Sequence, residues 1–284
     1  MATHDPIDPN GTLPVAIAVA PNGGRRTKAD HPALPLTQEE IAATASACLD
    51  AGACMIHVHV RDRSGGHLLN ADAYRTAIAA IRAAVGERMV VQITSEALGI
   101  YRSDEQMAVV RDVRPEAVSL ALRELVPDAS HESSFAGFLA WLRTERVIPQ
   151  IILYSPEEAV KLAALKARGL VPFEDVPVLY VLGRYTARQR STPADLLPFL
   201  AAEIPRFAHW SVCAFGVREN ACVTAGALLG GHVRVGFENN LLLPDGSIAP
   251  DNAALVAGAQ AAIGTCGLLA ATANELRAAW NRTA

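Results

Sequence analysis

Short apolar segments alternate with segments of helical pattern along almost the whole chain. Eight of them have the length and the continuous apolar character of a buried strand, and a helical segment follows each one. Continuous apolar strands are typical of a parallel sheet that helices cover on both faces. Eight such units in 284 residues predict a (β/α)8 TIM barrel. The predicted strands are residues 13–20, 55–62, 89–94, 117–122, 147–153, 176–182, 206–213 and 232–237.

A doubly wound open sheet is the alternative architecture, but no G-x-G-x-x-G motif follows the first strand. The sequence has no low-complexity segment or interdomain linker. We therefore expect a single domain over residues 1–284, with a polar leader at 1–12 that does not resemble a secretory signal and closing helices after residue 250. The other helices are predicted at 37–50, 71–85, 103–112, 132–145, 155–168, 193–203 and 219–229, the first of them opened by a capping box at 37–40.

The charge and the cysteines limit the kind of protein this is. A net charge of −4 gives no reason to expect nucleic acid or a membrane surface as a partner. Residues 253–273 carry no charge over the length of a membrane span, but glycines break the segment, so a buried helix and a turn are expected. The five cysteines are odd in number and lack C-x-x-C spacing. We interpret them as reduced core residues of a cytoplasmic protein.

Two histidines lie two residues apart in the second predicted strand. Side chains of a strand repeat every second residue, so His57 and His59 point to the same face, about 7 Å apart at Cα. Two imidazoles on one face can supply half of a metal site. The alternative is one core histidine next to one surface histidine, and a third ligand elsewhere would decide between them.

In a TIM barrel the site forms where the strands end. Polar or flexible residues stand at most of these ends. Glu238 offers the third ligand, because two histidines and one carboxylate form a zinc set that leaves a position open for substrate. The alternative for Glu238 is a solvated loop acid. The candidates by position are Asn22, Arg25, His57, His59, Thr94, Glu124, Tyr154, Gly183, Arg184, Glu238 and Asn239.

Several motifs resemble those of the β-keto acid cleavage enzymes, a large bacterial family. They are P-L-T-Q-E-E at 35–40, A-G-A at 51–53, H-V-H-V-R at 57–61 and G-G-H-V-R-V-G-F-E-N-N at 230–240. The resemblance runs from the first strand to the final helices. It implies a zinc-dependent TIM-barrel enzyme, usually a homotetramer. Such an enzyme acts on a β-keto acid and acetyl-CoA and gives acetoacetate and a new acyl-CoA.

The family's functional residues fall on particular positions of this sequence. Its zinc ligands match His57, His59 and Glu238, and its catalytic arginine matches Arg234. A substrate-binding serine after the third strand matches Thr94, which keeps the hydroxyl. Such a site acts by binding the β-keto acid through two oxygens, with zinc as Lewis acid and the arginine stabilising oxyanions. No redox cofactor is needed.

The sequence departs from the family at the residue after the zinc-binding glutamate. Family members pair the catalytic arginine with an aspartate there, whereas this chain has Asn239. An amide cannot accept the proton that a carboxylate would accept, so Asn239 is assigned to substrate binding together with Asn22. Glu124 is the alternative candidate for the base. Its other interpretation is a helix-start acid paired with Arg123.

A second departure concerns specificity. Where an amino-substrate member carries a glutamate after the first strand, this chain has Arg25. A cation there predicts a substrate with an anionic or neutral far end; the alternative is that Arg25 points to solvent or contacts a CoA phosphate.

Two further groups each have two interpretations. The residues Arg184, Arg188 and Arg190 either contact CoA phosphates or form a solvated face, and the residues Arg61 and Asp62 either orient a zinc ligand or form a loop ion pair.

Two other classes of function remain open from the sequence. A metal-dependent hydrolase of the amidohydrolase kind also uses H-x-H, but the fifth and sixth strands here offer no histidine. A metal-dependent aldolase on the same barrel is harder to distinguish. The other class is not an enzyme but a catalytically silent zinc or acyl-CoA binding protein. The asparagine at position 239 favours this class.

Overall fold

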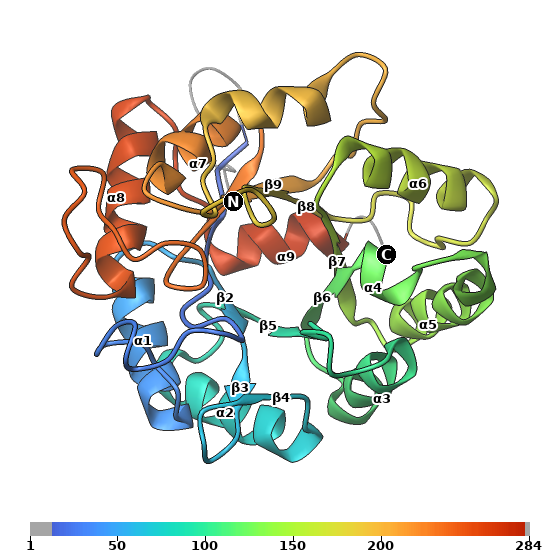
Figure 1. Cartoon of the computed structure of the whole chain (residues 1–284), viewed down its shortest axis with the longest axis horizontal. Coiled ribbons are helices and arrows are strands. Elements are labelled where there is room, and N and C mark those ends of the chain that lie inside the picture. The colour runs from blue at the N-terminus through green and yellow to red at the C-terminus, as the bar shows by residue number, and fades with distance from the viewer. Residues whose placement is uncertain (1–12, 282–284) are drawn as a thin grey trace, which may run out of the picture.

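Eight parallel strands close into a barrel in the computed structural model, which describes residues 13–281 (Figure 1). The order around the barrel is β1-β10-β9-β8-β7-β6-β5-β2, so the first strand pairs with the last. This closure confirms the predicted TIM barrel and excludes the open sheet. The strands are β1 (Ile17–Val19), β2 (Met55–Val58), β5 (Val90–Thr94), β6 (Ala117–Ala121), β7 (Ile148–Leu153), β8 (Val178–Leu182), β9 (Trp210–Ala214) and β10 (His232–Val235). The predicted leader at 1–12 lies outside the described residues.

Helices surround the barrel, as Figure 1 shows. The capping box at the start of α1 is present, with Thr37 accepting a hydrogen bond from the Glu40 backbone. The helices are α1 (Gln38–Asp50), α2 (Ala71–Val85), α3 (Ser103–Val113), α4 (Leu122–Leu125), α5 (Glu132–Thr144), α6 (Pro156–Ala167), α7 (Glu219–Leu228), α8 (Asn252–Thr265) and α9 (Ala273–Asn281), with 3-10 turns η1 (Ala129–His131) and η2 (Pro193–Leu200).

Some predicted boundaries were wrong. The α-helix expected at 193–203 is the 3-10 segment η2, because Pro198 lies inside it and has no N–H to donate. The strand expected at 55–62 ends at Val58. After His59 the chain forms a separate hairpin of β3 (Val60–Arg61) and β4 (His67–Leu68), which pair antiparallel outside the barrel. The first strand begins at Ile17 rather than at 13, and the seventh begins at Trp210 rather than at 206.

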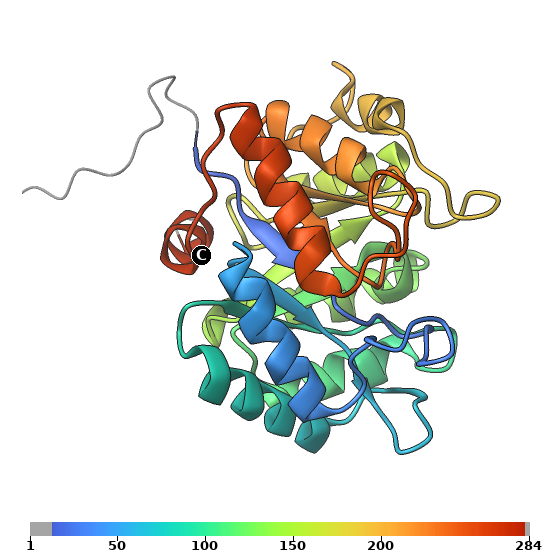
Figure 2. The same cartoon turned by 90° about the vertical axis from the view of Figure 1, so that its left-hand side faces the viewer.

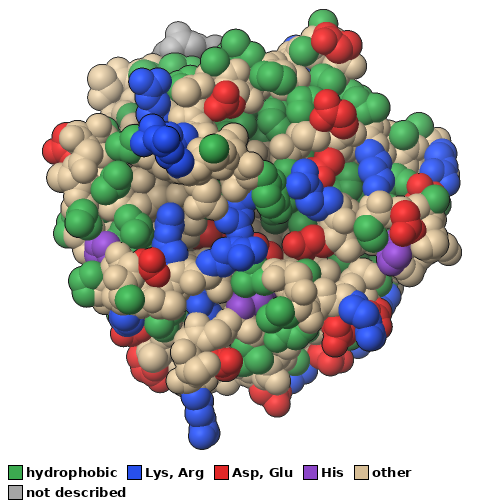
Figure 3. Space-filling view, in the orientation of Figure 1, with side chains coloured by type: hydrophobic (Ala, Val, Ile, Leu, Met, Phe, Trp, Pro, Cys, Tyr) green, Lys and Arg blue, Asp and Glu red, His purple; other side chains and the backbone are tan. Residues whose placement is uncertain are grey.

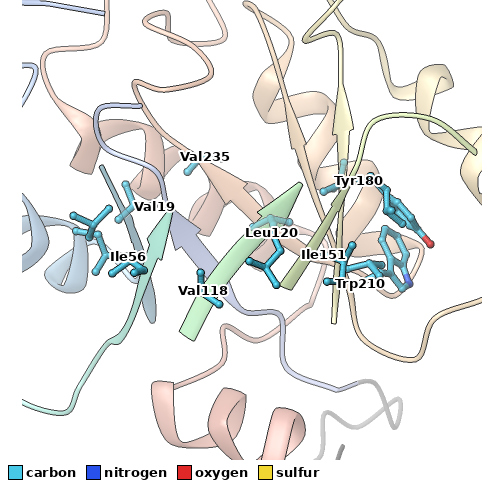
Figure 4. Packing of buried hydrophobic residues seen from close by; sticks show 14 of the residues in the cluster. Val19, Ile56, Val118, Leu120, Ile151, Tyr180, Trp210 and Val235 are labelled. Carbon is cyan, nitrogen blue, oxygen red and sulfur yellow. The ribbon is translucent and has the colours of Figure 1, made fainter. Parts of the chain in front are cut away.

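The main apolar core lies between the strands and the outer helices. Alternate residues of each strand face this layer, as Val118 and Leu120 of β6 do in Figure 4. The residues between them face the barrel interior, where Ser119 and Ala121 line a pocket. This two-residue period places polar side chains inside a barrel whose outer layer is apolar.

The helix α9 closes one end of the barrel. It packs Leu276 and Trp280 against Met55, Val90 and Ile148 at or near the points where their strands begin. Figure 2 shows α9 at this end, opposite the loops that follow the strands. The site therefore has to form at the other end, where those loops meet.

The described segments also bear on the membrane and cysteine predictions. Between residues 13 and 281 no helix is long and apolar enough to cross a membrane. The uncharged segment 253–273 forms most of α8 and the turn that follows it, as expected. All five cysteines are free, and four are buried, but Cys266 is exposed and is not the core residue that the sequence suggested.

Candidate metal centre and active site

Three side chains meet at the open end of the barrel. His57 lies in β2, His59 follows that strand directly, and Glu238 follows β10. Nε2 of His57 lies 3.1 Å from Nε2 of His59, and Oε2 of Glu238 lies 3.5 Å and 3.2 Å from these two nitrogens. Ligand atoms around a tetrahedral metal with bonds of about 2.0 Å are roughly 3.3 Å apart. The three atoms therefore have the spacing that a tetrahedral metal ion needs.

A chain of side-chain amides fixes the orientation of His57. Its Nδ1 lies 2.8 Å from Oε1 of Gln92, so Nδ1 carries the proton and donates it. Gln92 in turn donates to Gln150 at 3.2 Å, and Gln150 donates to Oγ of Ser211 at 3.2 Å. Burial lowers the pKa of His57 to about 3, which keeps the ring neutral. Its Nε2 therefore holds a free lone pair aimed at the other two ligand atoms.

Glu238 is held in its ionised form. Burial alone would raise the pKa of its carboxyl, but the positive charge of Arg234 lowers that pKa well below its usual value. Nη2 of Arg234 donates to Oε1 of Glu238 at 3.0 Å, while Oε2 has no hydrogen-bond partner among residues 13–281. An ionised oxygen without a partner, facing two imidazoles, suits a metal ligand.

The loop that carries Glu238 is pinned from several sides. Gly236 has φ +136°, and a Cβ there would lie 2.4 Å from the carbonyl oxygen of Ala20, so glycine is required. Glu219 accepts a hydrogen bond from the Gly236 N–H at 3.1 Å, and Oδ1 of Asn252 accepts one from the Phe237 N–H at 2.8 Å. These contacts explain the G-F-E stretch of the sequence motif, because they fix where Glu238 points.

A pocket opens above the three ligand residues. It lies at the end of the barrel where the strands end. Figure 3 shows basic, acidic and histidine side chains in a hollow at the centre of this face. The pocket is lined by His57, His59, Thr94, Glu96, Ser119, Ala121, Ile152, Tyr154, Val181, Arg184, Phe215, Arg234 and Glu238.

Several residues predicted from strand ends line this pocket. Thr94 is buried, and its Oγ1 accepts a hydrogen bond from the Glu96 N–H at 3.0 Å, so its own proton is available to a ligand. Arg234 is 3% exposed, and its Nε and Nη1 have no partner within the described part of the chain. Tyr154 and Arg184 also reach the pocket. These side chains, which belong to β5 and β10 or follow β7 and β8, therefore lie around one pocket.

The residues expected to bind substrate lie elsewhere. Arg25 is exposed and does not line the pocket. Asn22 is fully buried, and its amide donates to the carbonyl oxygens of Pro35 and His59 at 3.0 Å and 2.9 Å. Asn22 thus holds the backbone of a candidate ligand residue. Asn239 is buried outside the pocket lining, and neither atom of its amide has a partner among the described residues.

Glu124 lies behind the pocket and not in it. Its Oε2 accepts a hydrogen bond from the Ala97 N–H at 2.9 Å, and burial, with a smaller contribution from Glu96, raises the pKa of its carboxyl to about 7. The predicted ion pair with Arg123 is absent from the described contacts, because Arg123 donates to Glu158 at 2.6 Å. Glu124 therefore supports the loop after β5.

The arginine that follows the histidines has a structural role. Arg61 donates to the carbonyl oxygens of Gly23, Arg26 and Gly65 and forms no ion pair with its neighbour among residues 13–281. Asp62 instead accepts hydrogen bonds from the turn between β3 and β4. The interpretation as a loop ion pair was therefore wrong, and the two residues shape the loops around the site.

Sequence reasoning missed four residues that shape the site. Gln92 and Ser119 are polar residues at inward positions of apolar strands, and that parity could have identified them. Glu219 starts α7, and its buried carboxyl holds the Glu238 loop. Glu96 lines the pocket, with Oε2 3.9 Å from Nδ1 of His59 and Oε1 3.5 Å from Nη2 of Arg184. No pattern separates these two acids from ordinary surface acids.

Comparison with known proteins places this geometry in a family. The chain is 29% identical over 252 residues to a 3-keto-5-aminohexanoate cleavage enzyme of Fusobacterium nucleatum, covering 84% of this chain and 88% of that protein. It is 26% identical to a 3-oxoadipate:acetyl-CoA acetyltransferase of Cupriavidus necator, covering 94% of each. The structure of ObcA without ligand shares the fold, with a TM-score of 0.69 at 18% identity over 88% of this chain and 66% of that one.

The family model for beta-keto acid cleavage enzymes matches residues 14–281, which span nearly the whole chain. That range includes the barrel strands, the three ligand residues and the pocket lining. The chain therefore belongs to the β-keto acid cleavage enzyme family.

Proposed function

We propose that this protein is a zinc-dependent enzyme that condenses a β-keto acid with acetyl-CoA, giving acetoacetate and a new acyl-CoA. One observation carries the proposal. In a chain of this family, two buried imidazoles and an ionised carboxylate place three ligand atoms 3.1–3.5 Å apart at the floor of a pocket. The names of the relatives, which include acetyl-CoA transferases, support the co-substrate.

The donor set favours zinc as the metal. Two imidazoles and one carboxylate are typical of catalytic zinc, which keeps a position open for substrate. His57, His59 and Glu238 would hold the ion. When bound, Zn²⁺ supplies Lewis acidity to the keto oxygen, which acidifies the C2 protons of the β-keto acid and stabilises the enolate.

The remaining residues bind and orient the substrate. Arg234 is fixed by Glu238 and by Sγ of Cys213, which lies 3.3 Å from Nη2, and its Nε and Nη1 stay available as donors. Preorganised donors of this kind stabilise oxyanions without reorganisation. The hydroxyls of Thr94 and Ser119 line the same pocket and can donate to substrate oxygens.

The proposed reaction conserves all atoms of the two substrates. A base removes a proton from C2, and C2 forms a bond to the thioester carbon of acetyl-CoA. The bond between that carbon and the CoA sulfur breaks, the released thiolate forms a bond to the keto carbon of the β-keto acid, and the bond between the keto carbon and C2 breaks. C2 and its carboxylate leave with the acetyl group as acetoacetate, the proton returns to the product, and the remaining acyl group leaves as its CoA ester.

Among the described residues that line the pocket, Glu96 carries the one carboxylate that is not a candidate metal ligand. Glu124, suggested by its position after β6, does not line the pocket, and Asn239 cannot accept a proton. We therefore assign the proton acceptor to Glu96. A Glu96→Gln variant is expected to lose about 100-fold or more in kcat, and Glu124→Gln much less; steady-state kinetics with the best acid distinguishes the two.

The test of the function is turnover of the zinc-loaded protein with acetyl-CoA and a panel of β-keto acids, read by mass spectrometry. A new acyl-CoA together with acetoacetate in equal amount is the expected result. A protein that carries a full equivalent of zinc and yields no acyl-CoA from any acid would instead be a silent zinc or acyl-CoA binder. Metal analysis of the same sample, before and after chelation, checks the zinc requirement.

The proposal includes a homotetramer in the cytoplasm. The family resemblance implies the tetramer, and five free cysteines fit a reducing compartment. Light scattering after size exclusion should give four times the chain mass of 30.0 kDa. A mass of one or two chains would contradict the tetramer and leave the proposed reaction unaffected.

A further inference from the structure

Arg184 reaches across the open end of the barrel. It follows β8, yet its Nη2 lies 3.5 Å from Oε1 of Glu96, which follows β5. The strands β6 and β7 stand between these two in the barrel order. Its guanidinium carbon lies 5.2 Å from the ring centre of Phe215, and the side chain is 14% exposed. A cation is thus held over the pocket, mostly out of solvent.

The segment that carries Arg184 is firmly shaped. Gly183 has φ +78°, and a Cβ there would lie 2.9 Å from the backbone of Arg190. The hydroxyl of Thr186 donates to the carbonyl oxygens of Gly183 and Arg190 at 2.9 Å and 2.8 Å. The arginine is therefore oriented before any ligand arrives, which lowers the cost of binding one.

The guanidinium of Arg184 has few partners in the part of the chain that the structure describes. Within residues 13–281, the contact with Glu96 is its one ion pair, and no hydrogen bond from the guanidinium is formed. A guanidinium has five N–H donors in a fork that matches a carboxylate. Because Arg184 lines the pocket, an anionic group there could accept hydrogen bonds from the guanidinium without breaking a stronger contact.

The pocket wall next to Arg184 is apolar. Ala121, Ile152 and Val181 line it from β6, β7 and β8, and Phe215 adds a ring. The pocket therefore has a polar floor at His57, a wall suited to methylene groups, and a cation at the opening. A linear acid with a carboxylate at each end fits this sequence of surfaces.

We infer that Arg184 binds the distal carboxylate of the substrate and that the preferred substrate is a β-keto diacid. The inference rests on the proposed function, which places the β-keto acid end at the metal ligands. Arg25, where the sequence located this selectivity, is exposed outside the pocket. The same anion-binding chemistry could serve a phosphate of CoA, and the kinetics below separates the two sources.

The test compares 3-oxoadipate with 3-oxohexanoate, which have the same chain length and differ in the terminal carboxylate. Zinc-loaded wild type, Arg184→Gln and Arg184→Lys are assayed with acetyl-CoA. Arg188→Gln is the matched control, because it removes the same charge from an exposed position of the same segment. Thermal unfolding checks that each variant is folded.

The wild type should prefer the diacid. Arg184→Gln should lower kcat/KM for 3-oxoadipate by about 10- to 100-fold, the range of a charge-assisted hydrogen-bonded pair. Its value for 3-oxohexanoate should fall much less than its value for 3-oxoadipate, because only the contact of Arg184 with Glu96 changes for that acid, and the KM for acetyl-CoA should stay close to that of the wild type. Arg184→Lys should recover part of the loss, since it keeps the charge without the fork, and Arg188→Gln should match the wild type.

Three results would overturn the inference. An equal loss for both acids would give Arg184 a structural role. A raised KM for acetyl-CoA with unchanged acid preference would assign Arg184 to a CoA phosphate. A wild type that turns over the neutral acid as well as the diacid would remove the diacid preference while leaving the proposed function intact. Absence of acyl-CoA from every acid would reject the proposed function itself.

Discussion

The two ends of the barrel are lined by opposite kinds of side chain. Where the strands begin, α9 packs Leu276 and Trp280 against apolar neighbours. Where the strands end, Nε of Arg234, Oε2 of Glu238 and Oγ of Ser119 are buried without partners among the described residues. Unpaired buried polar groups cost free energy. One end therefore stabilises the fold, and the other keeps polar groups available for a ligand at the expense of stability.

This contrast predicts that the two ends can be changed separately. Substitutions under α9 should lower the free energy of unfolding without altering the chemistry. Substitutions at the ligand residues should remove the chemistry and leave the fold. The following experiments begin with the largest expected effect.

The first experiment removes a candidate metal ligand. His59→Ala leaves only two ligand residues, so we expect loss of bound zinc and a fall in kcat/KM of about 1,000-fold or more. Metal analysis and turnover measure the two effects, and circular dichroism should show an unchanged fold. His209→Ala, at a half-exposed position before β9, is the control and should keep its zinc. A fully active, zinc-loaded His59→Ala protein would show that the site is not the metal centre.

The second experiment addresses the opposite end. Trp280 is 2% exposed under the barrel, and Trp280→Ala should lower the free energy of unfolding by about 3–5 kcal/mol. The kcat measured well below the unfolding temperature should not change. Urea denaturation gives the stability, with Leu197→Ala, at a 60% exposed position, as the control. A large change in kcat at intact zinc content would mean that the two ends are coupled.

The third experiment uses the buried carboxyl that holds the Glu238 loop. Burial raises the pKa of Glu219 to about 8. The pKa of Glu219 is therefore higher in the folded state than in the unfolded state, so the folded state keeps the proton up to a higher pH. The free energy of unfolding should fall as the pH rises from about 4.5 toward 8. In the Glu219→Gln variant, the free energy of unfolding should decrease by roughly 2–4 kcal/mol less than in the wild type over this pH range.

Urea denaturation of the metal-free protein at pH 5, 7 and 9 measures the effect. The wild type and the exposed-site control Glu203→Gln should share the same slope, and Glu219→Gln should be flatter. Parallel curves for all three proteins would show that Glu219 does not titrate in this range.

The fourth experiment tests the amide chain behind His57. Gln92→Met removes the acceptor that fixes the Nδ1 proton, so zinc affinity should fall by about 10- to 100-fold. Competition with a chelator measures the affinity. At saturating zinc, kcat should fall less than the affinity does, because the three ligand residues remain. A loss of kcat with unchanged affinity would contradict a role in orienting the metal ligand.

The barrel could be predicted because the sequence pattern of each strand is local and recurs along the chain. Each buried strand is a continuous apolar run, and closure follows from the number of such runs. His57 and His59 could be paired because strand parity alone sets their face. Glu238 needed the family motif as well, since a loop acid after the last strand looks like any solvated acid.

Loop direction was the main source of error. Asn22 and Arg25 both follow the first strand, yet the amide of Asn22 binds backbone carbonyl groups and Arg25 is exposed. These outcomes depend on hydrogen bonds between segments far apart in the sequence. The turn at His59 was missed for the same reason, since the β-branched pattern continues through it while the chain leaves the barrel.

The pairing of β1 with β10 has a consequence for how the chain folds. Ile17 lies beside Val233, so the barrel closes through a contact between residues more than two hundred positions apart. Until residues 232–235 have been synthesised, β1 has one unpaired edge, and such edges invite wrong pairing with other strands. Long-range pairing of this kind is also slow. The barrel of this protein can therefore close only after residues 232–235 have left the ribosome.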